Sequence, residues 1–90
     1  MAYQIALTAT ARRSLQRIPE KAAHAVIEFM FGALADNPHR VGKSLHYELA
    51  GSWSARRAEY RVIYRIDDEH NLITIDVIAH RSDAYRRHQS

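Results

Sequence analysis

The sequence predicts an α+β domain in which a mixed or antiparallel sheet packs against a pair of helices. Three observations support this class: a short alternating run at the start, an apolar stripe with helical spacing in the middle, and strand-like runs after residue 52. Each strand-like run has one apolar and one mixed face. We therefore expect the apolar side of the sheet to pack on the helices and the other side to stay open.

The beginning of the chain predicts one strand and a first helix. Residues 3–8 alternate in polarity, as in a short strand, and the apolar side holds Tyr3, Ile5 and Leu7. Thr8 or Thr10 can cap the helix that follows. Its apolar positions have helical spacing: Ala11, Leu15 and Ile18. Pro19 ends this helix because proline has no N–H to continue the hydrogen-bond ladder.

A second helix follows Pro19, and it completes an αα-hairpin. Its apolar residues recur with the spacing of one helix face: Ala23, Val26, Ile27, Met30, Phe31 and Leu34. The sequence Asp36-Asn37-Pro38 closes it. Residues 39–52 are then expected to form a loop, with a short turn in SLHYELA.

Three strands in a meander are predicted at residues 53–59, 60–66 and 71–79, the last two joined by the acidic turn DDEH. In the middle strand alternation predicts an apolar face of Tyr60, Val62, Tyr64 and Ile66. The opposite face holds Arg61, Ile63 and Arg65. In the last strand the predicted apolar face is Ile73, Ile75, Val77 and Ala79. The predicted mixed face is Thr74, Asp76, Ile78 and His80.

Length and composition limit the class of protein. Ninety residues suit one domain spanning residues 1–90. The absence of cysteine excludes disulfides, thiolate zinc sites and cysteine nucleophiles, and the six histidines lack metal-ligand spacing, so we expect neither metal nor cofactor. No membrane span or signal segment is visible, which favours the cytoplasm. The net charge of +3 is consistent with a polyanionic partner.

Arginines on the open face form the main candidate site. Arg61 and Arg65 reach that face by alternation, and Arg56 can join them from the neighbouring strand. Strict alternation would aim Arg81 at the core, but we expect the alternation to fail near the strand end. Converging guanidinium groups fit a phosphate between them. The alternative is that they are solvated and pair with nearby carboxylates: Glu59, Asp67, Asp76 and Asp83.

Tyr85 lies four residues after Arg81 and adds a candidate proton acceptor. RNA can be cleaved by its own 2′-hydroxyl, so an enzyme needs only to orient the strand, move protons and stabilise charge on the phosphate. Neighbouring arginines would lower the pKa of a tyrosine from about 10. The alternative is that the Tyr85 ring simply packs on the sheet edge.

Two strings carry a family resemblance. The pattern W-x-x-R-x-x-[DE]-Y-R-[VIL]-[VIL]-Y spans Trp53 to Tyr64, and H-R-x-x-x-Y spans His80 to Tyr85. They follow TARRSLQRIP and NPHRVGKSL on the helical hairpin. Over nearly all 90 residues the chain resembles a toxin of the RelE/ParE superfamily, in its RelE branch.

The resemblance implies a ribosome-dependent, metal-independent endoribonuclease that cuts mRNA in the decoding site through the 2′-hydroxyl and leaves a cyclic phosphate. By position, Arg61 would stabilise the phosphate, Arg81 would act as acid or charge stabiliser at the leaving group, and Tyr85 would be the base or stack on a base. Arg56 would assist the nucleophile. Ser54 stands where the branch often has Lys or Arg, which removes one positive charge. Three residues are auxiliary candidates: Ser54 itself, Arg57 for charge and His80 for proton transfer.

The resemblance also implies partners. An acidic, RelB-like antitoxin would wrap the toxin and bring it to operator DNA, so that the pair represses its own operon. Further basic residues are candidates for RNA contact: Arg12, Arg13, Arg17, Lys21 and Lys43. On the helices the alternative is an ordinary solvated face.

Three other functions stay open. The ParE branch shares the fold but inhibits DNA gyrase, and it generally lacks the arginine and tyrosine set. A catalytically weak member would serve only as an antitoxin-bound regulatory module, which Ser54 and Ser82 would fit. A plain nucleic-acid-binding domain would account for the basic character alone.

Overall fold

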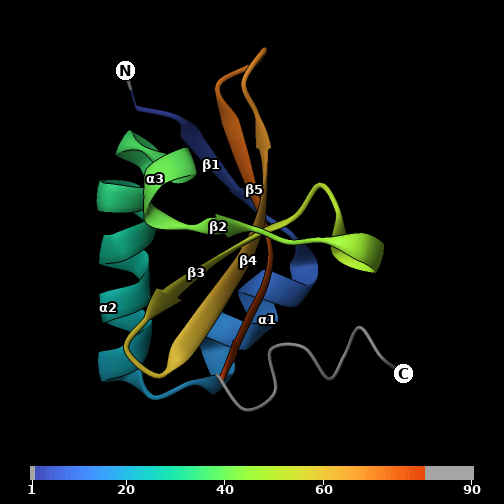
Figure 1. Ribbon diagram of the computed structural model, residues 1–90. Helices are drawn as coiled ribbons and strands as arrows, with labels where there is room; N and C mark the ends of the chain where they lie inside the picture. Colours follow the sequence, from blue (N-terminus) through green and yellow to red (C-terminus); the bar gives the residue numbers. More distant parts are fainter. Residues whose placement is uncertain (1, 81–90) are drawn as a thin grey trace.

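The computed structural model describes residues 2–80, which form one five-stranded sheet with helices packed against it (Figure 1). The strands are β1 (Gln4–Leu7), β2 (Lys43–Ser44), β3 (Trp53–Arg57), β4 (Tyr60–Asp67) and β5 (Leu72–His80). The helices are α1 (Ala9–Arg17), α2 (Glu20–Phe29) with its π-helical continuation η1 (Met30–Leu34), α3 (Pro38–Val41) and the 3₁₀ turn η2 (Tyr47–Leu49). Within residues 2–80, no helix is long and apolar enough to cross a membrane.

The sheet is mixed, as predicted. Its strand order is β1-β5-β4-β3-β2. The last three strands form the expected antiparallel meander, and β1 runs parallel to β5 at the other edge. A parallel pairing at this edge is possible because the helical hairpin carries the chain back across the sheet between β1 and the meander.

Thr8 fixes the start of α1, as one of the two predicted caps. Its hydroxyl oxygen accepts a hydrogen bond from the backbone N–H of Ala11 at 3.1 Å. The same hydroxyl donates to the backbone carbonyl of Asp76 in β5 at 2.8 Å. The cap of α1 is therefore tied directly to the last strand.

The second helix buries a narrower stripe than predicted. Val26, Met30 and Leu34 are fully buried, but Ile27 and Phe31 are 39% and 60% exposed. Each of these two lies one residue, or about 100° of helical rotation, past a buried position. The sheet covers only one line of residues on this helix, Val26, Met30 and Leu34, which recur every four positions. The predicted burial of Ile27 and Phe31 was therefore wrong.

One hydrophobic core joins both helices to one face of the sheet. It contains Ala11 of α1, Met30 at the start of η1, and fully buried strand residues such as Tyr64 and Ile73. We call the opposite face of the sheet the arginine face; it carries Ser54, Arg56, Arg61, Ile63 and Arg65. This face is not uniformly open, because Ile63 is only 1% exposed.

Residues 38–44 are more ordered than the loop expected there. Pro38 occupies the first turn of α3, where its missing N–H costs nothing, and Lys43 and Ser44 pair with β3. The buried Tyr64 hydroxyl donates to the Pro38 carbonyl at 2.7 Å. Gly42 leaves room for the Tyr64 side chain, because a Cβ at residue 42 would collide with the Tyr64 hydroxyl. The short turn expected in SLHYELA is present as η2.

A β-bulge in β5 changes the predicted faces of its second half. Ile63 pairs with Val77, but Tyr64 pairs with Ile75, so Asp76 is an extra residue in β5. Ile73 and Ile75 point to the core as predicted. After the bulge, each residue of β5 points to the face opposite to the one that strict alternation predicts. Ile78 joins the core, while Val77 and Ala79 pair with Ile63 and Arg61 and so lie on the arginine face. The assignments of Val77, Ile78, Ala79 and His80 by strict alternation were therefore wrong.

Candidate nucleic-acid interface

Arg56 and Arg61 lie directly opposite each other on β3 and β4. The register is set by a tight turn at Ala58 and Glu59, in which Ala58 adopts a positive φ of 55°. Like charges at directly opposed positions of an antiparallel pair destabilise it. An anion bound between the two guanidinium groups would relieve this repulsion, and phosphate matches their geometry.

The two side chains have different surroundings. Arg56 is exposed, and its Nε donates to the Ala58 carbonyl at 3.3 Å. Within residues 2–80, Arg56 forms no ion pair. Arg61 is half-buried, and its Nε is enclosed by protein. A partly desolvated guanidinium interacts more strongly with an anion than a fully solvated one does. Arg61 is thus the better placed of the two to hold a phosphate.

Arg65, on the same face and strand, is paired as predicted with a nearby acid. Its Nε and Nη2 donate to the two carboxylate oxygens of Asp76, each at 2.8 Å. The hydrogen bond with Asp76 raises the pKa of Arg65, so the Asp76 carboxylate stabilises the positive charge of this guanidinium. Asp76 is the bulge residue of β5, so the bulge supplies the carboxylate that occupies this arginine.

Ser54 and Lys43 extend the arginine face toward the edge of the sheet. Ser54 pairs with Ile63 on one side and with Lys43 on the other, so all three residues lie in one row. Ser54 is buried, whereas Lys43 is exposed. Lys43 was expected only as a general RNA contact. Its place beside Ser54 depends on the two-residue strand β2, which the sequence pattern did not reveal.

Arg57 and His80 lie on the opposite, helix-covered face. Both are register partners of Tyr60, whose ring packs against the core. The rings of Tyr60 and His80 make an edge contact at 5.7 Å, and His80 Nε2 is 3.4 Å from the Glu59 carboxylate. Of the three auxiliary candidates, Arg57 and His80 therefore do not share the face of Arg56 and Arg61, whereas Ser54 does.

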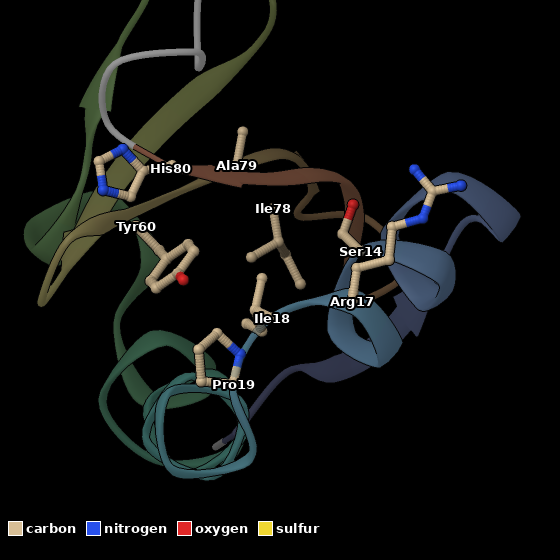
Figure 2. A pocket seen from close by; sticks show the side chains of 8 residues that line it. All are labelled: Ser14, Arg17, Ile18, Pro19, Tyr60, Ile78, Ala79 and His80. Atoms are coloured by element: carbon tan, nitrogen blue, oxygen red, sulfur yellow. The ribbon is translucent and has the colours of Figure 1, made fainter.

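A cavity of about 270 Å³ lies beside His80, between the sheet and the end of α1 (Figure 2). Tyr60 and Ile78 line it from the sheet, and Arg17 and Pro19 line it from the helical side. Figure 2 shows the Arg17 guanidinium turned away from the Tyr60 ring. Neither Arg56 nor Arg61 lines this cavity.

The basic residues of the helical hairpin are exposed: Arg12, Arg13, Arg17 and Lys21. Arg13 Nη2 donates to the Thr10 hydroxyl at 3.3 Å. These residues belong to the helical layer that covers the other side of the sheet. They form a second basic surface rather than an extension of the arginine face. Arg81 and Tyr85 lie outside the described residues.

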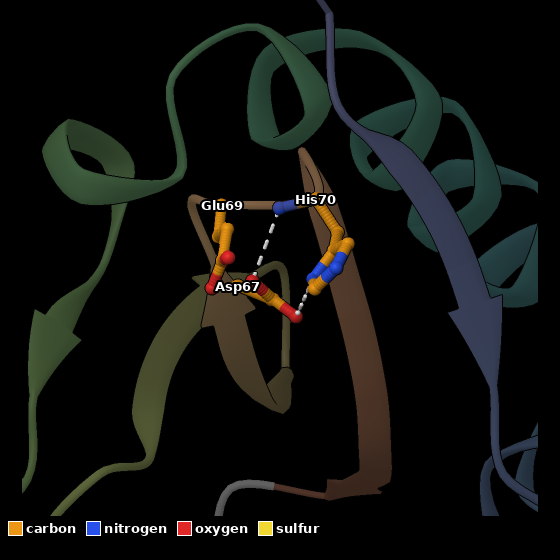
Figure 3. Close-up of side chains that lie close together, drawn as sticks. All are labelled: Asp67, Glu69 and His70. Carbon is orange, nitrogen blue, oxygen red and sulfur yellow. Dashed lines mark hydrogen bonds and ion pairs between the residues drawn. The ribbon is translucent and has the colours of Figure 1, made fainter.

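Two acidic residues and a histidine lie close together at the turn of the β4–β5 hairpin: Asp67, Glu69 and His70 (Figure 3). The Asp67 carboxylate accepts one hydrogen bond from the His70 backbone N–H at 3.1 Å, and its second oxygen lies 2.8 Å from His70 Nδ1. These contacts lower the pKa of Asp67, with the His70 side chain as the largest cause. The contacts within the turn account for the geometry of this group.

A second polar cluster joins the same hairpin to the start of the chain. Tyr3 donates its hydroxyl proton to Asp68, and His39 Nε2 lies 3.0 Å from both oxygens of that carboxylate. The hydrogen bond from Tyr3, followed by the contact with His39, lowers the pKa of Asp68. His39 thus connects α3 to the hairpin.

Comparisons with known proteins agree with this arrangement. A family profile described as "ParE toxin of type II toxin-antitoxin system, parDE" matches residues 5–85. The chain belongs to this family of toxins. It is 57% identical over 84 residues to Toxin RelE of Mycobacterium tuberculosis, covering 93% of this chain and 87% of that protein. It is 53% identical over 87 residues to Toxin RelG of the same organism, covering 97% and 100%.

Solved structures confirm the RelE-like fold. The toxin–antitoxin complex RelBE2 from M. tuberculosis matches with a TM-score of 0.87 and 51% identity, covering 92% of this chain and 95% of that chain. The intact E. coli RelBE complex matches with a TM-score of 0.75 at 12% identity, covering 88% and 96%, which shows the fold alone. The predicted RelE/ParE superfamily and α+β fold are both confirmed.

Proposed function

We propose that this toxin is a ribosome-dependent endoribonuclease that cleaves mRNA in the decoding site and so inhibits translation. The observation that supports the proposal most is the direct opposition of Arg56 and Arg61 on one face of the sheet. Two cations at one position favour an anion between them. In a protein that acts on RNA, the scissile phosphate is that anion.

The proposed reaction needs no metal. The RNA 2′-oxygen attacks the adjacent phosphorus, the bond to the 5′-oxygen of the next nucleotide breaks, and a 2′,3′-cyclic phosphate remains. Arg61 stabilises the added negative charge on the phosphate, and Arg56 favours the deprotonated nucleophile. Tyr85 accepts the proton of the 2′-hydroxyl, and Arg81 stabilises or protonates the leaving oxygen. These last two roles rest on the family resemblance.

The proposed protein partner is an acidic, RelB-like antitoxin. The similar M. tuberculosis protein is in a RelBE2 toxin–antitoxin complex, at 51% identity to this chain. A net charge of +3 favours an acidic partner, which would cover the basic surfaces and block RNA. Through this antitoxin the toxin would reach operator DNA and take part in repressing its operon. Such a module acts in the cytoplasm, where its ribosomal target is.

The exposed basic residues of α1 and α2 give the proposal a second contact surface. They lie on the helical side, so they cannot hold the same phosphate as Arg61. A toxin seated in the decoding site is surrounded by ribosomal RNA. We assign these residues to that RNA and the arginine face to the mRNA.

Gyrase inhibition is the alternative, and the family profile gives it support because it carries the ParE name. The deciding experiment is primer extension on a translated mRNA with the purified toxin, in parallel with a DNA supercoiling assay. We expect new mRNA 3′ ends only when ribosomes are translating, and unchanged supercoiling. Intact mRNA together with accumulated relaxed DNA would show that the toxin inhibits gyrase instead.

A further inference from the structure

Lys43 lies on the arginine face because β2 is in register with β3. Lys43 is directly opposite Ser54, and Ser54 is directly opposite Ile63, a neighbour of Arg61 on this face. The hydrogen bond from the Leu45 N–H to the Ser52 carbonyl at 2.8 Å continues the pairing beyond β2. The exposed ammonium therefore belongs to the same surface as the two opposed arginines.

Gly42 keeps this short strand close to β3. A Cβ at residue 42 would lie 3.0 Å from the Ser54 carbonyl oxygen and would also collide with the buried Tyr64 hydroxyl. Only a residue without a side chain permits this approach. The backbone of Lys43 is thus held next to a rigid part of the sheet rather than at the tip of a loop.

The spacing of the cations fits a chain of phosphates rather than a single one. Ser54 and Arg56 are two residues apart on β3, so the row of Lys43 lies about 6.6 Å along the strand from the row of Arg56 and Arg61. This separation is comparable to that of neighbouring phosphates in an extended single strand.

The remaining cation of this face on β4 does not compete for the ligand. Arg65 lies beyond Ile63, and Asp76 holds it through two hydrogen bonds. The arginine face therefore has an anion-binding end, with Lys43, Arg56 and Arg61, and a neutralised end. An RNA strand would bind to the first end.

We propose that Lys43 binds the phosphate next to the scissile one, so that the arginine face holds two successive phosphates of single-stranded RNA. This inference rests on the proposed RNA function and adds to it the number of RNA phosphates that the arginine face contacts. Lys43 supplies on β2 a positive charge that position 54 of β3 lacks. Its contribution is electrostatic, so it depends on charge and on salt concentration.

The test is binding of a short single-stranded RNA, with 2′-O-methyl groups that prevent cleavage, to the purified full-length toxin. Fluorescence anisotropy is measured from low to moderate salt for the wild type and for Lys43→Gln, Lys43→Arg and Arg40→Gln. We expect Lys43→Gln to weaken binding several-fold at low salt and to reduce the slope of log K against log salt by about 0.7. Lys43→Arg should keep the slope. Arg40 is exposed on α3, in the helical layer, so Arg40→Gln should also keep it.

A slope for Lys43→Gln equal to that of the wild type overturns the proposal, and so does an equal loss in the Arg40→Gln control. Wild-type toxin that shows no salt-dependent binding of this RNA overturns it as well. The nuclease proposal can fail separately. If binding depends on Lys43 but translated mRNA stays intact, the phosphate site stands and the cleavage function does not.

Discussion

The two faces of the sheet carry different kinds of residue on the same strands. Toward the helices, Val62, Tyr64 and Ile73 are fully buried, and they join α1 and α2 in one core. On the arginine face, Arg56 and Arg61 lie directly opposite each other. The comparison shows that alternation along a strand separates the residues of the core from those of the proposed phosphate site. Substitutions on the two faces should therefore have separable effects.

The largest expected effect is on activity, from Arg61→Ala. Loss of one donor that stabilises charge in a transition state typically lowers the rate about 100- to 1,000-fold. We expect a loss of this size in single-turnover cleavage of ribosome-bound mRNA, with an unchanged far-UV circular dichroism spectrum. Arg65→Ala is the matched control, because Arg65 is already held by Asp76. Equal rates for wild type and Arg61→Ala would contradict the assignment.

On the other face, Gly42→Ala should reduce stability. The added methyl group would collide with the Tyr64 hydroxyl, so either the tyrosine or β2 must move, and such overpacking costs about 1–3 kcal/mol. Urea unfolding measures the loss. Gly32→Ala is the control, since nothing lies within 4 Å of a Cβ there, and helix propensity predicts a small gain. If both variants are equally stable, Gly42 does not have the role described.

Tyr64→Phe tests the same contact without steric strain. It leaves the buried Pro38 carbonyl without its donor, which costs about 1–3 kcal/mol in the free energy of unfolding. Burial raises the pKa of Tyr64 to about 12, above its ordinary value of 10. The unfolded chain therefore loses this proton first as pH rises. Stability from this group is complete below pH 10 and is lost as pH rises toward 12.

The measurement is urea unfolding at pH 8 and at pH 11 for wild type and Tyr64→Phe. The other tyrosines are common to both proteins, so the difference between the two pH profiles isolates Tyr64. We expect the stability gap between them to narrow at pH 11. A gap of constant size would show that Tyr64 titrates equally in the folded and unfolded chains.

Sequence patterns predicted the core elements well because they are periodic. Helical spacing placed Val26, Met30 and Leu34 correctly, and period-two alternation placed Tyr64 and Arg61 on opposite faces. A β-bulge depends on tertiary contacts, which here include the hydrogen bond from the Thr8 hydroxyl to the Asp76 carbonyl. No local sequence pattern indicates such a bulge. The alternation therefore failed after Asp76.

The residues of the candidate site stay a prediction, and the sequence did not predict how Arg56 and Arg61 pair. The opposition of Arg56 and Arg61 depends on a two-residue turn at Ala58 and Glu59, which lack the Asn-Gly or Asp-Gly signal of such turns. Lys43 joined the site through a strand of only two residues. Only the first of these features could have been found by counting a hairpin register backward from Tyr60.

The smallest expected effect concerns the neutralised end of the arginine face. Arg65 and Asp76 form a bidentate pair, but Arg65 is about half exposed, so solvent screens the interaction. A double-mutant cycle with Arg65→Ala and Asp76→Ala should give a coupling of about 0–1 kcal/mol in urea unfolding. RNA cleavage should change little in either variant. A fall in cleavage for Arg65→Ala as large as that for Arg61→Ala would extend the anion site over the whole face. The distinction between its two ends would then be lost.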